Sequence, residues 1–199
     1  MIHSTLRQVV DITWPTLVIV LSIFIILRIA YITKSDRGFV LHEEIFDLLF
    51  VAYILVLYQL VTSQDIAGGG TNLMPFREIL RYDVGTINFK KQVIGNIVMF
   101  MPFGYFAGSY CKIKKVSGIA LMSLLVSLII ETVQHYIGRC FDIDDIILNV
   151  CGGICGFLVL IAFRAIEKHL PDFMQRDWFK NVICIIILAL IAFGIIRFY

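Results

Sequence analysis

Long apolar stretches separated by short polar connections constrain this chain more than any other feature. They cover residues 12–32, 45–61, 93–110, 116–137, 143–163 and 182–196. A helical stretch of about 20 apolar residues spans the hydrocarbon core of a bilayer. A composition that is 59% hydrophobic and only 16% charged does not fit a soluble globule. The sequence therefore predicts an all-α fold, a polytopic transmembrane helical bundle of about six spans, forming a single membrane domain over residues 1–199.

The connection over residues 63–92 is long and carries content of its own. Three consecutive glycines ending at Gly70 open it as a flexible tether. Pro75 then fits the first position of a short amphipathic helix. We predict a short interfacial helix here. It either lies on the membrane surface or forms a lid that carries Arg77 and Arg81 over a site.

Charge and cysteine usage exclude other classes. The formal net charge of +2 is too small to indicate nucleic acid binding. The cysteines form no C-x-x-C pair, which argues against a zinc or redox site, and Cys151 and Cys155 are interpreted as small packing residues. Basic residues are more frequent in the connections after the first, third and fifth spans than in the other connections. The positive-inside rule therefore places these connections inside and predicts that the 63–92 loop and the 139–145 turn face outward.

Polar residues gather towards one end of three spans. They are Asn96 near the start of the third span, Glu131 and Gln134 near the end of the fourth, and Asp145 and Asn149 near the start of the fifth. At about 1.5 Å per residue, Glu131 and Asn149 lie roughly 9 Å inside their spans. Burying these groups without partners would cost several kcal/mol. We therefore expect them to contact one another, Arg139 or a ligand.

The turn from Arg139 to Asp145 adds carboxylates to that end. Asp142, Asp145 and Asn149 are spaced i, i+3 and i+7, which places them on one face if the segment is helical. The group is either a structural network that ties the helices together or a hydrophilic pocket open to the outer face. Further along, the G-x-x-x-G spacing that ends at Gly156 predicts close approach of a neighbouring helix.

Four motifs follow in order. They are Asn72-Leu73-Met74-Pro75-Phe76, Asn96-x-x-x-Phe100-x-Pro102-Phe103-Gly104, Glu131-x-x-Gln134, and Gly138-Arg139 with Asp142-x-Asp144-Asp145-x-x-x-Asn149-x-x-Gly152. Together they resemble the VanZ-like family over residues 72–160, with 45–61 as the first helix of the shared core. The spans 12–32 and 182–196 then flank that core.

The resemblance implies a protein of the cell envelope, because the family is named for a protein linked to low-level resistance to the glycopeptide antibiotic teicoplanin. The leading hypothesis is a multi-pass cell-membrane protein that binds an envelope lipid or a peptidoglycan precursor. Arg139 could hold a phosphate, and the carboxylates could hold an amine or a divalent cation. The expected ligand-binding residues are Asn72, Arg77, Asn96, Glu131, Gln134, Arg139, Asp142, Asp145 and Asn149.

An alternative hypothesis is a membrane enzyme that acts on a lipid-linked phosphate. Glu131 or Asp145 would be its general base, with a cation at the Asp cluster as cofactor. The sequence lacks a nucleophile–base motif that would strengthen this view. A third hypothesis is a scaffold or transporter subunit whose polar groups only fix the packing.

Overall fold

The computed structural model describes residues 16–62 and 70–198, apart from 17, 32 and 34–38. It confirms an all-α membrane fold. Four helices are long and apolar enough to cross a bilayer, and the residues described also include the shorter apolar helix Val18–Tyr31. The four are α2 (Leu41–Thr62), a helix over Ile87–Tyr110, α6 (Val116–Tyr136) and α7 (Ile143–Glu167).

The chain divides into two compact units, Leu57–Arg164 and a second made of Met1–Val56 with Ala165–Tyr199. In the second unit, α8 (Asp172–Gln175) precedes α9 (Asp177–Phe198), which covers the predicted last span. Only part of the predicted span 12–32 is described, and the glycines before Gly70 lie outside the described residues.

The guanidinium of Arg28 is paired inside the second unit. The Arg28 guanidinium lies 2.5 Å from Glu44 Oε2 and 3.0 Å from Asp47 Oδ2. Asn181 Oδ1 accepts a hydrogen bond from the backbone N–H of His42 at 3.0 Å, which ties α9 to the start of α2. A cation on an apolar helix is thus neutralised within its own unit.

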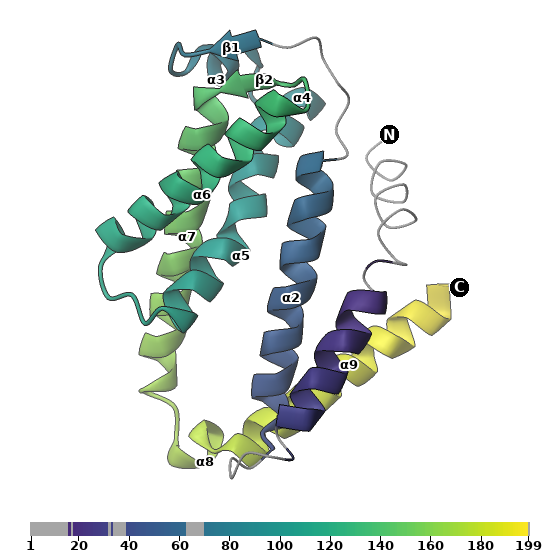
Figure 1. The fold of residues 1–199 in the computed structure, drawn as a ribbon. Helices are drawn as coiled ribbons and strands as arrows, with labels where there is room; N and C mark the ends of the chain where they lie inside the picture. The colour runs from purple at the N-terminus through teal and green to yellow at the C-terminus, as the bar shows by residue number, and fades with distance from the viewer. Residues whose placement is uncertain (1–15, 17, 32, 34–38, 63–69, 199) are drawn as a thin grey trace. The chain divides into compact units, whose positions relative to one another are not determined.

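The Leu57–Arg164 unit is built around α5 (Gly95–Tyr110), α6 and α7. Two short strands, β1 (Gly70–Asn72) and β2 (Cys140–Asp142), pair in parallel at one end of these helices, next to α3 (Arg77–Arg81) and α4 (Ile87–Phe89), as Figure 1 shows. The strand pair was not predicted. It joins segments that lie about seventy residues apart in the sequence, with Asn72 opposite Asp142.

The helix α6 has its polar face turned inward. Its buried residues, spaced at three or four, are Ile119, Ser123, Ser127, Glu131 and Gln134. Residues on its other side, such as Leu125 and Ile129, are exposed. A soluble helix has the reverse pattern, so this arrangement suits a helix with lipid outside and polar partners inside.

Glycines let α7 contact its neighbours through backbone atoms. A Cβ added at Gly156 would overlap the carbonyl oxygen of Met101, and one at Gly152 would overlap that of Ile97. A Cβ at Gly153 would collide with Ser123 Oγ on α6. The close approach predicted from the G-x-x-x-G spacing is confirmed, with α5 as the partner. Cys151 and Cys155 are exposed, so their predicted role as packing residues was wrong.

The third apolar helix starts earlier than predicted, at Ile87 instead of residue 93. Its entry contains a π-helical turn over Lys90–Ile94, whose wider backbone leads directly into α5. Because α5 then runs without a break through Pro102, the wide turn is the irregular part of this helix. The short helix α3 also differs from expectation. It starts at Arg77, with Phe76 as N-cap, so Pro75 precedes the helix.

Candidate functional site

The end of α6 places the first polar groups of the site. Gly138 has a φ of 90°, a left-handed conformation that glycine adopts without strain. The N–H of Gly138 donates to His135 O at 3.1 Å and that of Arg139 donates to Gln134 O at 2.9 Å. These two bonds form a Schellman motif that ends the helix and turns the chain into β2.

Glu131 is buried, and protein groups occupy both of its carboxylate oxygens. Oε2 accepts from the backbone N–H of Asp142 at 2.9 Å. Gln134, with its amide oriented to satisfy both ends, donates from Nε2 to Glu131 Oε1 at 2.8 Å and accepts from the Arg139 guanidinium. Arg139 is thereby held at the mouth of the site through Gln134.

Asp142 lies on β2 and not on a helix. Its predicted place on one helical face with Asp145 and Asn149 is therefore wrong, because pairing with β1 keeps this residue extended. Its Oδ1 accepts from Asn72 Nδ2 and from the backbone N–H of Asp144, both at 2.9 Å. Burial raises the pKa of Asp142, and burial together with the nearby Asp142 charge raises the pKa of the Cys140 thiol.

Asp144 was not predicted as a site residue, yet it is only 1% exposed and binds three backbone donors. Its Oδ1 accepts from Phe76 N–H at 2.5 Å. Its Oδ2 accepts from Glu78 N–H at 2.7 Å and Ile79 N–H at 3.3 Å. A carboxylate from α7 therefore caps the start of α3. Asp144 attaches the β1–α3 segment to the end of the helices.

Among the described residues, Asp145 resembles Asp142 in keeping one carboxylate oxygen that accepts no hydrogen bond. Its Oδ1 accepts from Asn96 Nδ2 of α5 at 2.6 Å. The charges of Glu131 and Asp145 lie close enough to repel each other, and both are attracted by Arg139. The structure thus shows the predicted contact between the polar ends of α5, α6 and α7.

One helical turn deeper, Asn149 is 2% exposed and donates from Nδ2 to Ser127 Oγ at 2.9 Å. Its Oδ1 is buried without a hydrogen-bond partner, as is Ser123 Oγ on the next turn of α6. The serines were missed from the sequence. The available signal was that Ser123, Ser127 and Glu131 follow one another at intervals of four residues, which places them on one face of a helix.

We refer to these residues together as the polar cluster: Asn72, Asn96, Ser127, Glu131, Gln134, Arg139, Asp142, Asp144, Asp145 and Asn149. They come from β1, α5, α6, β2, α7 and the turn after α6. The sequence pattern of the VanZ/LLP1 family matches residues 45–164, which include the whole cluster. The chain belongs to the VanZ/LLP1 family. No curated protein and no solved structure matches it.

One predicted ligand residue, Arg77, does not belong to the polar cluster. It is exposed on α3. Its neighbour Arg81 pairs with Glu78 at 3.2 Å. A ligand role for Arg77 stays a prediction.

Within the described part of the chain, no three His, Cys, Asp or Glu side chains are grouped so that they could hold a metal ion. Asp144 explains part of this, because backbone N–H groups take up its oxygens.

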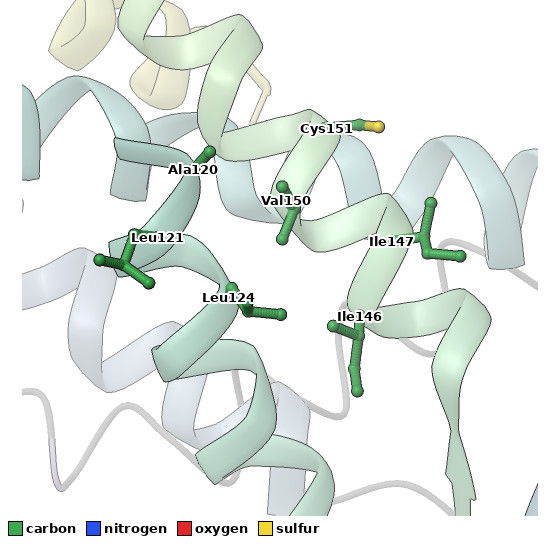
Figure 2. A pocket seen from close by; sticks show the side chains of 7 residues that line it. All are labelled: Ala120, Leu121, Leu124, Ile146, Ile147, Val150 and Cys151. Atoms are coloured by element: carbon green, nitrogen blue, oxygen red, sulfur yellow. The ribbon is translucent and has the colours of Figure 1, made fainter. Parts of the chain in front are cut away.

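An apolar groove of about 380 Å³ lies beside the polar cluster, between α6 and α7. Figure 2 shows Leu124 of α6 pointing towards the side of α7 that carries Ile146 and Val150. The complete lining is Ala120, Leu121, Leu124, Ile146, Ile147, Val150 and Cys151. Ile146 and Ile147 follow Asp145 directly in α7, so the groove lies next to cluster residues on the same helix.

Proposed function

We propose that this VanZ/LLP1 protein is a multi-pass protein of the cell membrane that binds an envelope lipid or a peptidoglycan precursor in the polar cluster. The cluster would face outward, and altered presentation of such a ligand would produce low-level teicoplanin resistance. The observation that carries the proposal is the buried polar cluster with acceptors left over. A purely structural network would be expected to satisfy its buried groups internally.

The apolar groove supports a ligand that is anchored in the membrane. A lipid-linked molecule needs a polar site for its headgroup and an apolar surface for its chain. The groove begins at Ile146, the residue after Asp145, and runs along α6 and α7. A headgroup at Asp145 would therefore leave the acyl chain against Leu121 and Leu124.

The test is growth inhibition by teicoplanin and by vancomycin in a susceptible Gram-positive host. The host would express wild type, Glu131→Gln, Asp145→Asn or the control His135→Gln, with membrane abundance measured for each. His135 is exposed at the same end of α6 and makes a fair control. We expect protection from teicoplanin to be lost in the two cluster variants at unchanged abundance, and to be kept in the control.

Two results would count against this proposal. If Glu131→Gln and Asp145→Asn lower abundance in step with protection, the cluster is a scaffold that fixes the packing. If wild type gives no protection and purified protein binds no envelope lipid, the binding function is wrong.

A second candidate function is favoured by the closeness of Glu131 and Asp145, because paired carboxylates in one site can act as acid and base. The protein would then be an enzyme acting on a lipid-linked phosphate. Release of inorganic phosphate or of a free headgroup from such a lipid, lost in Asp145→Asn, would support it. Binding without turnover would support the binding function instead.

A further inference from the structure

The polar cluster is rich in negative charge. It contains the carboxylates of Glu131, Asp142, Asp144 and Asp145 but a single guanidinium, that of Arg139. Arg139 already donates to Gln134. The nearby Arg81 pairs with Glu78 and Arg77 is exposed. A phosphate entering this site would meet excess negative charge in a place where little water screens it, and a cation would be attracted.

The oxygens of the carboxylates are not equally available. Asp144 accepts three backbone N–H groups, and both oxygens of Glu131 accept hydrogen bonds. Asp145 accepts one bond, from Asn96 to Oδ1. Within the residues that the structure describes, Oδ2 of Asp145 and Oδ2 of Asp142 are the carboxylate oxygens of the cluster that accept no hydrogen bond, and of these two residues only Asp145 lies on α7, one turn above Asn149.

Asn149 provides an independent observation that also points to a donor. It lies one turn below Asp145 on α7, and its Nδ2 bonds to Ser127, which lies one turn below Glu131 on α6. The Asn149 amide thus stands beneath the two carboxylates. Its Oδ1 is buried without a partner, and so is Ser123 Oγ. Leaving a buried acceptor unpaired destabilises the fold, and a ligand donor would remove that cost.

We propose that the group bound in the polar cluster is a primary ammonium, held by Asp145 with Asn149 as the acceptor beneath it. An ammonium has three donors and no acceptor, which complements a set of unfilled acceptors with excess negative charge. A divalent metal ion would need several oxygen ligands gathered around one point. The described residues contain no such group. This inference rests on the proposed binding function and specifies its ligand class.

The ammonium could belong to a lipid headgroup or to a soluble amine, and the experiment distinguishes these sources. Purified protein in nanodiscs of phosphatidylglycerol would be titrated with short-chain phosphatidylethanolamine, phosphatidylcholine or phosphatidylglycerol, and separately with ethanolamine. Binding would be followed by native mass spectrometry and by the thermal unfolding midpoint. Wild type would be compared with Asp145→Asn, Asn149→Leu and the control His135→Gln.

We expect phosphatidylethanolamine to bind at least about tenfold more tightly than phosphatidylglycerol or phosphatidylcholine, a factor worth one charge-assisted hydrogen bond. Asp145→Asn should abolish that preference and Asn149→Leu should reduce it, while His135→Gln should leave it intact. Asn149→Leu removes the unpaired buried acceptor and also the bond from Asn149 Nδ2 to Ser127 Oγ, so its unfolding midpoint without lipid is compared with that of wild type to separate an effect on folding from an effect on binding. Stabilisation by ethanolamine alone would support the ammonium and show that no acyl chain is needed.

Other outcomes would overturn the inference in distinguishable ways. Phosphatidylglycerol binding as tightly as phosphatidylethanolamine, with the same dependence on Asp145, would rule out the ammonium but leave headgroup binding in place. Equal binding of all three lipids by wild type and Asp145→Asn would overturn both the inference and the proposed function.

Discussion

The polar cluster and the glycine contact with α5 both include residues of α7, and they are held by opposite means. At the cluster, polar side chains from six segments meet through hydrogen bonds. Deeper in the unit, missing side chains at Gly152 and Gly156 bring backbone against backbone. The glycine contact with α5 depends on shape, whereas the cluster keeps unused acceptors. The glycine contact therefore serves stability, and the cluster is the place where we propose that a ligand binds.

The largest expected effect comes from filling the glycine contact. In Gly156→Ala the new Cβ overlaps Met101 O, a backbone atom that cannot move aside. We expect a loss of about 3 kcal/mol or more, at the upper end of the range for overpacking. Thermal unfolding in detergent measures it. The control is Gly95→Ala, where the nearest atom lies at 3.7 Å and which should be neutral or stabilising. Equal effects in the two variants would contradict a contact built on shape.

The next effect concerns the attachment of α3. Asp144→Asn replaces a carboxylate that accepts three backbone N–H groups by an amide with one acceptor. We expect a cost of about 2 kcal/mol and faster trypsin cleavage after the exposed Arg77 and Arg81. Asp172→Asn, in the exposed first turn of α8, is the control. Unchanged cleavage kinetics would show that α3 is held by something else.

A smaller effect is expected at the end of α6. Gly138→Ala places a Cβ on a residue with φ of 90°, which costs about 1–2 kcal/mol. Gly138→Asn should cost less, because Asn tolerates left-handed backbone. Comparison of the unfolding midpoints checks this order. If Ala is tolerated as well as Asn, the Schellman motif does not need its positive φ.

The smallest effect is a pH dependence of Asp142. Burial raises the pKa of Asp142, so the stability it provides is present below its unfolded pKa, about 3.9, and is lost as pH rises through the higher folded value. Asp142→Asn keeps the acceptor and removes the titration. The unfolding midpoint of wild type relative to Asp142→Asn should therefore fall as pH increases from acid to neutral. A difference independent of pH would contradict the role of burial.

The features that the sequence predicted share a local cause. The length of an apolar stretch determines whether it can span the membrane. The spacing of Gly152 and Gly156 determines which face of the helix can contact a neighbour, whichever helix that neighbour is. The convergence of Asn96, Glu131 and Asp145 was also predictable, because buried polar groups near one membrane depth must find each other. Whether the cluster residues bind a ligand stays a prediction.

The features that escaped prediction depend on distant partners. Asp144 and Asp145 are neighbours of the same type in the sequence, but one caps α3, more than sixty residues away, and the other faces Asn96. The extended conformation of Asp142 likewise follows from pairing with Asn72. Spacing within one helix carries no information about such partners.

The wide turn at Lys90–Ile94 has a consequence for the rotational register of the helix it opens. Each residue advances an α-helix by about 100°, so a turn that accommodates one extra residue rotates everything after it relative to everything before it. Asn96 stands just beyond that turn, and its amide meets Asp145 only at the present angle. Restoring a regular turn by deleting one residue would swing Asn96 aside and would also rotate Met101, whose carbonyl oxygen packs against Gly156. The turn thus sets the azimuth of the whole of α5, and with it that of the Asn96 amide, relative to the segment before it.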